Sequence, residues 1–276
     1  MLHITGDTRV FAIFGDPIRQ VKTPELLNHY FVEHGINGVL VPLHVSADNF
    51  DEVFEAARGI ENLDGFIVTV PHKKRAFELC DEIIPASANI GAINAIRRNG
   101  EGRFIGGMFD GLGFVQGLKT QGHQLSGKKV LLLGAGGAAI AIAHALLTEG
   151  IDCLFIHNRT KAKAHALKAQ LTEHHESARV EVGMPEPKIA DIIINATSLG
   201  MHDSDPLPVA EDFLTPAVLA VEIIMRPAMT RFLTVAEQKG AHIHLGKHML
   251  KEQVRLMADF MCAKDTQEGT CQLNRP

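Results

Sequence analysis

The sequence predicts an α/β protein of two domains, each with a mostly parallel sheet and helices on both faces. The length of 276 residues fits two domains, because domains average roughly 150 residues. Apolar, strand-like runs alternate with helix-like stretches over residues 10–80 and again over residues 129–245. Strands joined by helices pair in parallel, so each series predicts one such sheet.

The first series begins with a continuous apolar run at 10–14, which predicts a buried strand. Thr23 as N-cap and Pro24 at the first helical position open a helix that ends at Gly35. In the next strand, Pro42 indicates an edge position. The remaining elements expected here are that strand at 38–45, a helix from Asp48 to Arg58, a strand at 65–70 and a helix at 72–80.

A loop-rich region at 85–110 separates the two series, and a helix from about Asp110 to Gln121 leads into the second. The final helix, from about 247 to 263, follows a complete second unit, so we expect it to return to the first domain, with a frayed tail at 264–276. The expected domains are 1–110, with 247–276 packing back on it, and 111–246. The second series comprises strands at 129–133, 152–156, 179–183, 190–195, 218–224 and 241–245, and helices at 137–149, 160–174 and 230–239.

Composition excludes several classes of protein. Lys and Arg number 27 against 32 Asp and Glu, and this mild acidity argues against nucleic acid or an anionic membrane as the main partner. The four cysteines show no CxxC spacing, and residues 1–20 lack the pattern of a signal peptide. We therefore expect reduced thiols and a cytoplasmic protein. With 14 Phe, one Tyr and no Trp, we expect a mostly aliphatic core and a site without a wall of Trp and Tyr.

The glycine-rich segment GAGGAA (134–139) carries the most specific signal. It follows a strand and opens an alanine-rich helix, which is the context of a dinucleotide-binding G-x-G-x-x-A turn rather than of a membrane span. Gly134 permits the tight turn, Gly136 lets the backbone approach a pyrophosphate, and the N–H groups at the helix start receive phosphate. Small residues needed only for packing are the alternative. The expected binding residues are Gly134, Ala135, Gly136, Gly137 and Ala138.

The next strand ends in a segment that indicates which dinucleotide is bound. An acidic residue there would bind a ribose 2′-hydroxyl, but this chain has Asn158, Arg159, Thr160 and Lys161. Two cations and two hydrogen-bonding side chains suit a 2′-phosphate, which favours NADP(H) over NAD(H), with NAD(H) still possible. The alternative is that Arg159 and Lys161 are solvated residues at a helix start.

The segment NATSLGM (195–201) follows another apolar strand and would lie at the carboxyl edge of the same sheet. Asn195, Thr197 and Ser198 are therefore expected to contact the ribose or nicotinamide. Capping of the turn by the same side chains is an equally good interpretation.

Several segments together resemble the shikimate dehydrogenase family. They are GDPIRQVKTP (15–24), VTVPHK (68–73), GAIN (91–94), FDGLGF (109–114), GAGGAA (134–139), NRT (158–160), NATSLGM (195–201) and GKHMLKEQ (246–253). The resemblance implies an N-terminal substrate domain, a C-terminal Rossmann domain and an active site in the cleft between them. It also implies reversible hydride transfer between a nicotinamide and a ring hydroxyl.

By this resemblance Lys73 and Asp110 are the catalytic pair. Lys73 would relay the hydroxyl proton, and Asp110 would orient it and bind the neighbouring hydroxyl. Without the resemblance they would pass for a surface lysine at a helix start and a helix N-cap. The same motifs place Thr69, Asn94 and Gln253 on the ring hydroxyls and Gly246 at the cofactor.

Departures from the family pattern fall at the substrate carboxylate. The S-x-S pair that holds it is Val21-Lys22-Thr23 here, the histidine before that pair is Gln20, and a tyrosine that assists aligns with Met225. We still expect Val21, Thr23 and Met225 to line the substrate site. The other altered positions are Ile67, Met108 and Phe109.

The loss of charge-assisted hydrogen bonds, about 1.5–3 kcal/mol each, predicts that shikimate is a poor substrate. The expected partner is a related cyclic polyol or hydroxy acid, bound by a monomer or homodimer. A genuine shikimate or quinate dehydrogenase and a non-catalytic dinucleotide sensor are the alternatives. The histidines at 174–175 and 242–248 lack a convincing metal-ligand spacing, and hydride transfer needs no metal.

Overall fold

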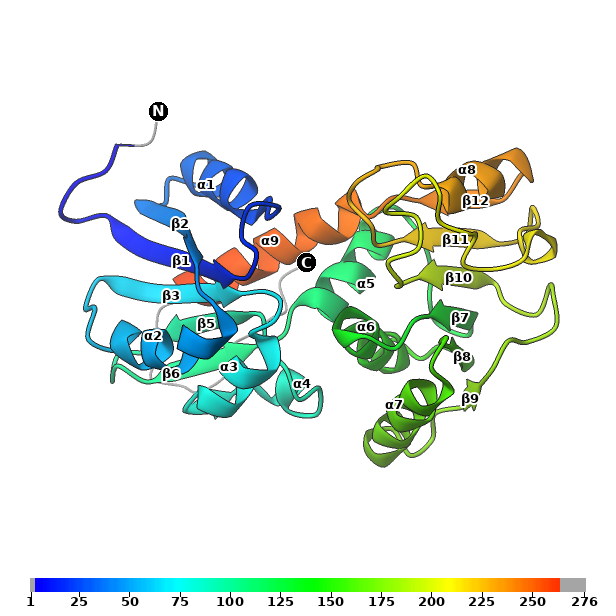
Figure 1. Cartoon of the computed structure of the whole chain (residues 1–276), viewed down its shortest axis with the longest axis horizontal. Coiled ribbons are helices and arrows are strands. Elements are labelled where there is room, and N and C mark those ends of the chain that lie inside the picture. The colour runs from blue at the N-terminus through cyan, green and yellow to red at the C-terminus, as the bar shows by residue number, and fades with distance from the viewer. Residues whose placement is uncertain (1–2, 264–276) are drawn as a thin grey trace. The chain divides into compact units, whose positions relative to one another are not determined.

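The computed structural model describes residues 3–263 and divides the chain into two compact units. The first unit contains the chain up to Phe109 and again from Val254 onward, and the second contains Asp110–Gln253. Each unit holds one six-stranded sheet. The predicted α/β class with two mostly parallel sheets is confirmed (Figure 1).

The sheet of the first unit has the strand order β2-β1-β3-β5-β6-β4. β1 pairs in parallel with β2 and β3, whereas β5 runs antiparallel to both β3 and β6. Pro42 lies in the edge strand β2, as predicted, where its missing N–H costs no ladder bond. The strand bounds are β1 Arg9–Gly15, β2 Gly38–His44, β3 Leu63–Val68, β4 Glu82–Ile83, β5 Ala95–Arg98 and β6 Phe104–Gly107.

Helices cover the first sheet, and a cluster of phenylalanines fills one side of it. Phe14, Phe50, Phe54, Phe66 and Phe104 are all at most 1% exposed, and several of their rings meet edge to face. Aliphatic residues still form the majority of this core, as expected, but the phenylalanines are concentrated in it. Its helices are α1 Thr23–Glu33, α2 Phe50–Ala57, α3 Lys73–Leu79 and α4 Pro85–Ala88, with a 3₁₀ turn at Ala47–Asn49.

The sheet of the second unit has the order β12-β11-β10-β7-β8-β9, and all of its pairs are parallel. In order of appearance this is the doubly wound order 3-2-1-4-5-6, in which the chain reverses direction between the first and fourth strands. That reversal lies between β7 and β10. The strand bounds are β7 Lys129–Leu133, β8 Cys153–His157, β9 Val180–Val182, β10 Ile192–Asn195, β11 Leu219–Glu222 and β12 His242–His244.

Successive side chains of β7 pack on opposite faces of this sheet. Val130 and Leu132 join a cluster with side chains of α5, α6 and α7, while Leu131 and Leu133 join one with α8. Both clusters are mainly aliphatic, as expected. The helices are α5 Asp110–Thr120, α6 Gly137–Thr148, α7 Lys161–His174 and α8 Arg231–Gln238, with a 3₁₀ turn at Glu211–Phe213. The last helix, α9 Lys247–Cys262, begins in this unit and belongs to the first unit from Val254 onward.

Three local expectations need correction. The segment 85–110 was expected to be loop-rich but contains α4, β5 and β6. The N-cap of α1 is Lys22, so Thr23 is its first helical residue. Asp48 lies in the 3₁₀ turn before α2, whose N-cap is Asn49. The frayed tail expected at 264–276 lies outside the described residues.

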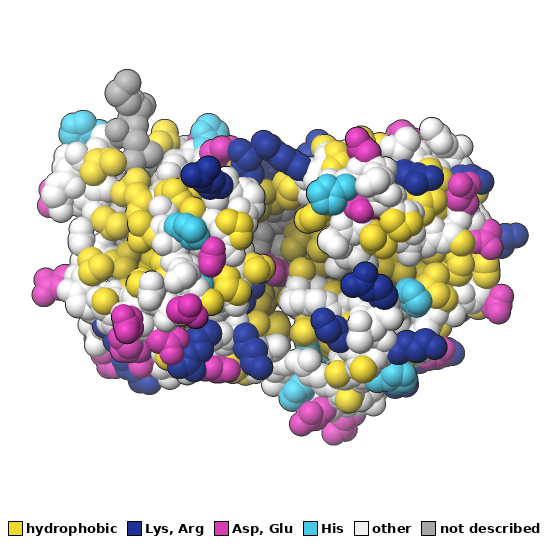
Figure 2. Space-filling model, viewed as in Figure 1, with side chains coloured by type: hydrophobic (Ala, Val, Ile, Leu, Met, Phe, Trp, Pro, Cys, Tyr) yellow, Lys and Arg dark blue, Asp and Glu magenta, His cyan; other side chains and the backbone are white. Residues whose placement is uncertain are grey.

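The apolar run at 130–147 forms β7, the glycine turn and most of α6. Among residues 3–263, no helix combines the length and apolar character needed to cross a bilayer. Cys80, Cys153 and Cys262 are free thiols. Acidic and basic side chains are interspersed over the face shown in Figure 2.

Candidate functional site

In the second unit, the glycine turn after β7 leaves backbone N–H groups open for a ligand. Gly134 has φ +116°, and a Cβ there would come within 2.6 Å of the Ala196 carbonyl oxygen, so only glycine fits. Gly136 is the N-cap of α6, and no side chain caps this helix. Nothing lies within 4 Å of a Cβ at Gly136 or Gly137. The turn therefore fits the pyrophosphate of a dinucleotide.

The segment after β8 presents cations to solvent. Arg159, Thr160 and Lys161 are exposed, and the first turn of α7 carries no acidic residue. Asn158 donates from Nδ2 to the Thr160 carbonyl at 2.9 Å, which shapes the loop. Arg159 and Lys161 are thus placed where a 2′-phosphate beside β8 would meet positive charge.

In the loop after β10, Asn195 and Thr197 make the contacts of the turn-capping alternative. Asn195 was expected to face the cofactor, but it is 0% exposed, and its Nδ2 donates to Glu222 and to the Leu199 carbonyl. Thr197 donates from Oγ1 to Asn195 Oδ1 and accepts from the Leu199 N–H, which is turn capping. Ser198 is exposed. Asn195 therefore shapes the loop, whereas Ser198 remains open to a ligand.

Asp110 and Gln253 lie together in the second unit. Asp110 is the first residue of α5 and is 3% exposed, and it accepts a hydrogen bond from Gln253 Nε2. Glycines make this approach possible, because a Cβ at Gly113 would lie 2.8 Å from Gln253 Cα. A Cβ at Gly117 would lie 2.9 Å from the backbone of His248. The two residues predicted from separate motifs thus form one polar pair.

Thr69, Lys73 and Asn94 lie together in the first unit. Thr69 and Lys73 follow the carboxyl end of β3, and the His72 N–H donates to the Thr69 carbonyl at 2.8 Å. The Lys73 carbonyl accepts from Ile93, and the Asn94 carbonyl accepts from Val68. The segment VTVPHK is therefore bonded directly to the segment GAIN.

Two side chains stiffen this arrangement. His72 is buried, its Nε2 lies 2.8 Å from the Val45 carbonyl, and its ring stacks on Phe50. Burial lowers the pKa of His72, so it adds no positive charge beside Lys73 at neutral pH. Asn94 is 2% exposed, and its Oδ1 accepts from the Phe109 N–H at 2.9 Å. Asn94 thus also fixes the residue that precedes Asp110.

The positions that depart from the family pattern fall into two groups. Ile67, Met108 and Phe109 are at most 3% exposed and belong to the core. Val21 and Thr23 in the first unit and Met225 in the second are only half-buried. Gln20 is exposed, and Lys22 Nζ pairs with Glu25 at 2.8 Å. The apolar changes open to a ligand are therefore Val21 and Met225.

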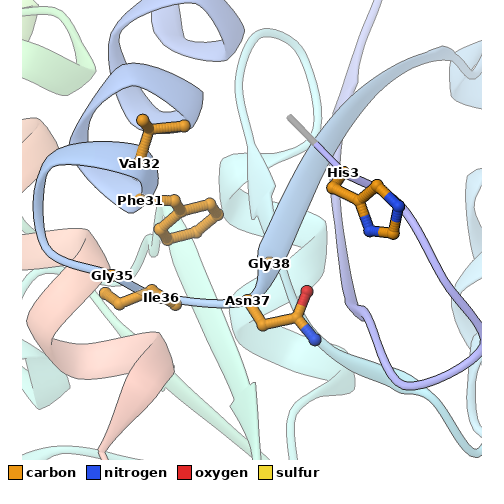
Figure 3. A pocket seen from close by; sticks show the side chains of 7 residues that line it. All are labelled: His3, Phe31, Val32, Gly35, Ile36, Asn37 and Gly38. Atoms are coloured by element: carbon orange, nitrogen blue, oxygen red, sulfur yellow. The ribbon is translucent and has the colours of Figure 1, made fainter. Parts of the chain in front are cut away.

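Gly246 is buried, and a Cβ there would come within 2.6 Å of the Ile224 carbonyl oxygen. The structure shows no metal-binding group of three or more His, Cys, Asp or Glu within residues 3–263. A shallow hollow between the end of α1 and the start of β2 is lined by Phe31, Val32 and Asn37 (Figure 3). It lies at the amino end of β2, away from Thr69 and Lys73.

Sequence reasoning missed the buried carboxylate of Glu222. It is 1% exposed and ends β11, where four donors surround it. The available signal was a single acidic residue closing the apolar strand LAVE.

A doubly wound parallel sheet with an open glycine turn defines a dinucleotide-binding protein. The polar side chains of the first unit and the pair Asp110–Gln253 of the second unit are of the kinds that bind a hydroxylated compound.

Comparison with known proteins then identifies the family. Residues 13–96 match the shikimate dehydrogenase substrate binding domain, and residues 117–202 match shikimate / quinate 5-dehydrogenase. The shikimate dehydrogenase (NADP(+)) of Rubrobacter xylanophilus is 37% identical over 91% of this chain and 89% of its own length. The chain belongs to the shikimate dehydrogenase family, as its motifs predicted.

Solved structures of different specificity share the fold. The 5-ketofructose reductase of Gluconobacter sp. strain CHM43 is 29% identical, with a TM-score of 0.86 and 94% coverage of both chains. A shikimate 5-dehydrogenase from Listeria monocytogenes, solved with shikimate and NAD, is 27% identical, with a TM-score of 0.87 and coverage of 96% of this chain and 95% of that one.

Proposed function

We propose that this chain is an NADP-dependent oxidoreductase of shikimate dehydrogenase type whose substrate is a polyol or keto sugar without a carboxylate. NAD(H) is the weaker cofactor. The observation that carries the substrate class is the apolar character of Val21 and Met225, the half-buried residues where the family pattern has a serine and a tyrosine for the carboxylate.

The retained residues support the reaction type. Bound NADP⁺ supplies the acceptor for the hydride that leaves the carbinol carbon. The hydroxyl proton then passes to Lys73, and Asp110, held by Gln253, binds the neighbouring hydroxyl. Thr69, Asn94 and Gln253 are uncharged hydrogen-bonding groups, which suit a polyol.

The preference for NADP rests on the segment after β8. Exposed Arg159 and Lys161 can pair with a 2′-phosphate, and no carboxylate in the first turn of α7 repels it. The curated relative from Rubrobacter xylanophilus carries NADP(+) in its name. The sensor interpretation is less well supported, because a protein without turnover has no need for both Lys73 and Asp110.

Genuine shikimate dehydrogenase activity is the second candidate. It is favoured by the name of the 37%-identical relative and by the retained residues on the ring hydroxyls. The structurally similar 5-ketofructose reductase favours the first candidate, since the name of its substrate denotes a keto sugar. The two candidates therefore differ in whether the substrate carries a carboxylate.

The test is a substrate panel assayed by absorbance of the reduced cofactor. The panel contains shikimate and quinate with NADP⁺ and NAD⁺, and 5-ketofructose and neutral cyclic ketones with NADPH and NADH. We expect the neutral compounds with the NADP pair to give the highest kcat/KM. A shikimate kcat/KM of about 10⁵ M⁻¹s⁻¹ or more, above every neutral compound, would establish the second candidate instead.

A further inference from the structure

We infer that Glu222 is a positioning residue for the nicotinamide half of the cofactor, because its buried carboxylate joins the loops that follow β10 and β11. The inference rests on the proposed function, since it assumes that a nicotinamide dinucleotide is bound. It assigns a role in the reaction to a residue that lies inside the protein.

The position of Glu222 in the sheet indicates which half of the dinucleotide is concerned. A dinucleotide spans the crevice at the point where the strand order reverses, here between β7 and β10. Its adenosine ribose lies beside the segment after β8, on one side of this point. β10 and β11 are on the other side, so the loops after them face the nicotinamide half. Glu222 is the last residue of β11.

The carboxylate connects the two loops through both of its oxygens. Oε1 accepts from the N–H groups of Ile223 at 2.9 Å and Ile224 at 3.1 Å, in the loop after β11. Oε2 accepts from Asn195 Nδ2 and from Thr230 Oγ1, each at 2.9 Å. Asn195 continues the connection, because it also bonds to Thr197 and Leu199. One side chain therefore sets the shape of both loops.

Burial makes these bonds hard to replace. Glu222, Asn195 and Thr230 are at most 1% exposed, so water cannot substitute for a lost partner. Burial raises the pKa of Glu222, while the four hydrogen bonds oppose that rise. Three of the four partners are N–H groups, which can only donate. Only the Thr230 hydroxyl could accept a proton from the carboxyl, so each of the three N–H groups needs a lone pair of the Glu222 oxygens.

Close backbone contacts extend the network to the glycine turn. A Cβ at Gly200 would lie 3.2 Å from Thr230 Cβ, and one at Gly246 would lie 2.6 Å from the Ile224 carbonyl oxygen. Gly134 makes a similar approach to Ala196. The loops after β7, β10 and β11 thus contact one another around this carboxylate, and a change in its bonding shifts them together.

Replacing the acceptor by an amide gives the sharpest test. In Glu222→Gln the volume is nearly unchanged, but the new NH₂ group must face a donor, which breaks the bond to Asn195 or to the two N–H groups. Asn195→Asp breaks the same bond from the other side, because two carboxylates then face each other. In the double variant the new amide at position 222 can donate to the new carboxylate at position 195, so part of the arrangement is restored.

Two probes separate the halves of the cofactor site. Binding of NADPH and of adenosine 2′,5′-bisphosphate is measured by calorimetry for the wild type, both single variants and the double variant. We expect each single variant to lower the affinity for NADPH by about tenfold or more, and the affinity for the bisphosphate by less than about twofold. The double variant should recover most of the NADPH affinity. Glu149→Gln is the control, since Glu149 pairs with Lys119 near the far end of α6.

The outcomes are distinct. Unchanged NADPH binding in Glu222→Gln, or equal weakening of both probes without recovery in the double variant, would overturn the positioning role. A wild-type protein that binds neither probe would overturn the proposed function itself. Selective loss with recovery is the result that the inference predicts.

Discussion

The two units build their candidate binding edges from different kinds of atoms. In the second unit the edge after β7 is mainly backbone, because Gly134 and Gly136 bring N–H groups into the open. In the first unit the edge after β3 consists of side chains, chiefly Thr69 and Lys73. A backbone site recognises what every dinucleotide shares, whereas a side-chain site changes its ligand when one residue changes.

This difference explains where the departures from the family pattern occur. The GAGGAA turn retains the full dinucleotide pattern. Val21 in the first unit and Met225 in the second lack the hydroxyl groups of the family's carboxylate site, and Gln20 replaces its histidine by an amide. The comparison of the two units predicts that this protein still binds the family's cofactor but prefers a different substrate.

The largest expected effect follows from removing the proposed proton relay. Lys73→Ala should lower kcat by about 10²–10⁴-fold while NADPH still binds, because the two functions belong to different units. Turnover and NADPH titration measure the two effects. Lys74→Ala, at the exposed neighbouring position, is the matched control. Retained turnover in Lys73→Ala would remove the lysine from the mechanism.

The next effect concerns stability in acid and distinguishes the units. Burial lowers the pKa of His144 to about 4 and that of His244 to about 3, and neighbouring histidines add to both shifts. His174 and His175 face the first, and His123 and His248 face the second. His144 and His244 both belong to the second unit, whereas the first unit has one buried histidine with a lowered pKa, His72, so the second unit should be the more acid-sensitive.

The sign follows from the lowered pKa values. Between pH 6.5 and the folded-state pKa the unfolded chain binds more protons, so stability is full above about pH 6.5 and falls with pH. When the pH falls from about 7 to about 5, each histidine should lower the free energy of unfolding by about 2 kcal/mol. Urea denaturation of His144→Leu/His244→Leu should show a flatter pH dependence than the wild type. His29→Asn, at an exposed position of α1, should retain the wild-type slope. Equal slopes in all three proteins would contradict the assignment.

A smaller effect is expected on the cofactor preference, which we assign to the side chains of Arg159 and Lys161 after β8. Arg159→Ala and Lys161→Ala should each reduce the preference for NADP⁺ over NAD⁺ by about tenfold, since each removes one charged contact to the 2′-phosphate. The ratio of the two kcat/KM values measures it. Lys168→Ala, further along α7, should leave the ratio unchanged. A ratio unaffected by either change would favour the solvated-cation interpretation.

The fold was largely predictable where its signals are local. The strands and helices of the second unit have clear apolar runs and glycine punctuation, and their expected bounds agree closely with the structure. β5 and β6 were missed because they are short and pair antiparallel with partners that no local pattern specifies. The phenylalanine cluster was missed because composition does not reveal how rings are distributed between two cores.

The candidate site was predictable only as far as its motifs reach. The motifs singled out Asp110 and Gln253 separately, and the hydrogen bond between them could not be predicted because they are far apart in the sequence. Asn195 was given a ligand-facing role because its position at a strand end was known and its burial was not. Glu222 was missed because its importance comes from donors contributed by two loops.

The central claim is that Val21 and Met225, in place of a serine and a tyrosine, make the protein prefer a substrate without a carboxylate. The most direct measurement is the ratio of kcat/KM for 5-ketofructose reduction to kcat/KM for shikimate oxidation, in the wild type and in Val21→Ser/Met225→Tyr. We predict a ratio well above one in the wild type and a fall of about tenfold or more in the double variant, as hydroxyls to the carboxylate are restored. A wild-type ratio below one that the double variant leaves unchanged would contradict the claim.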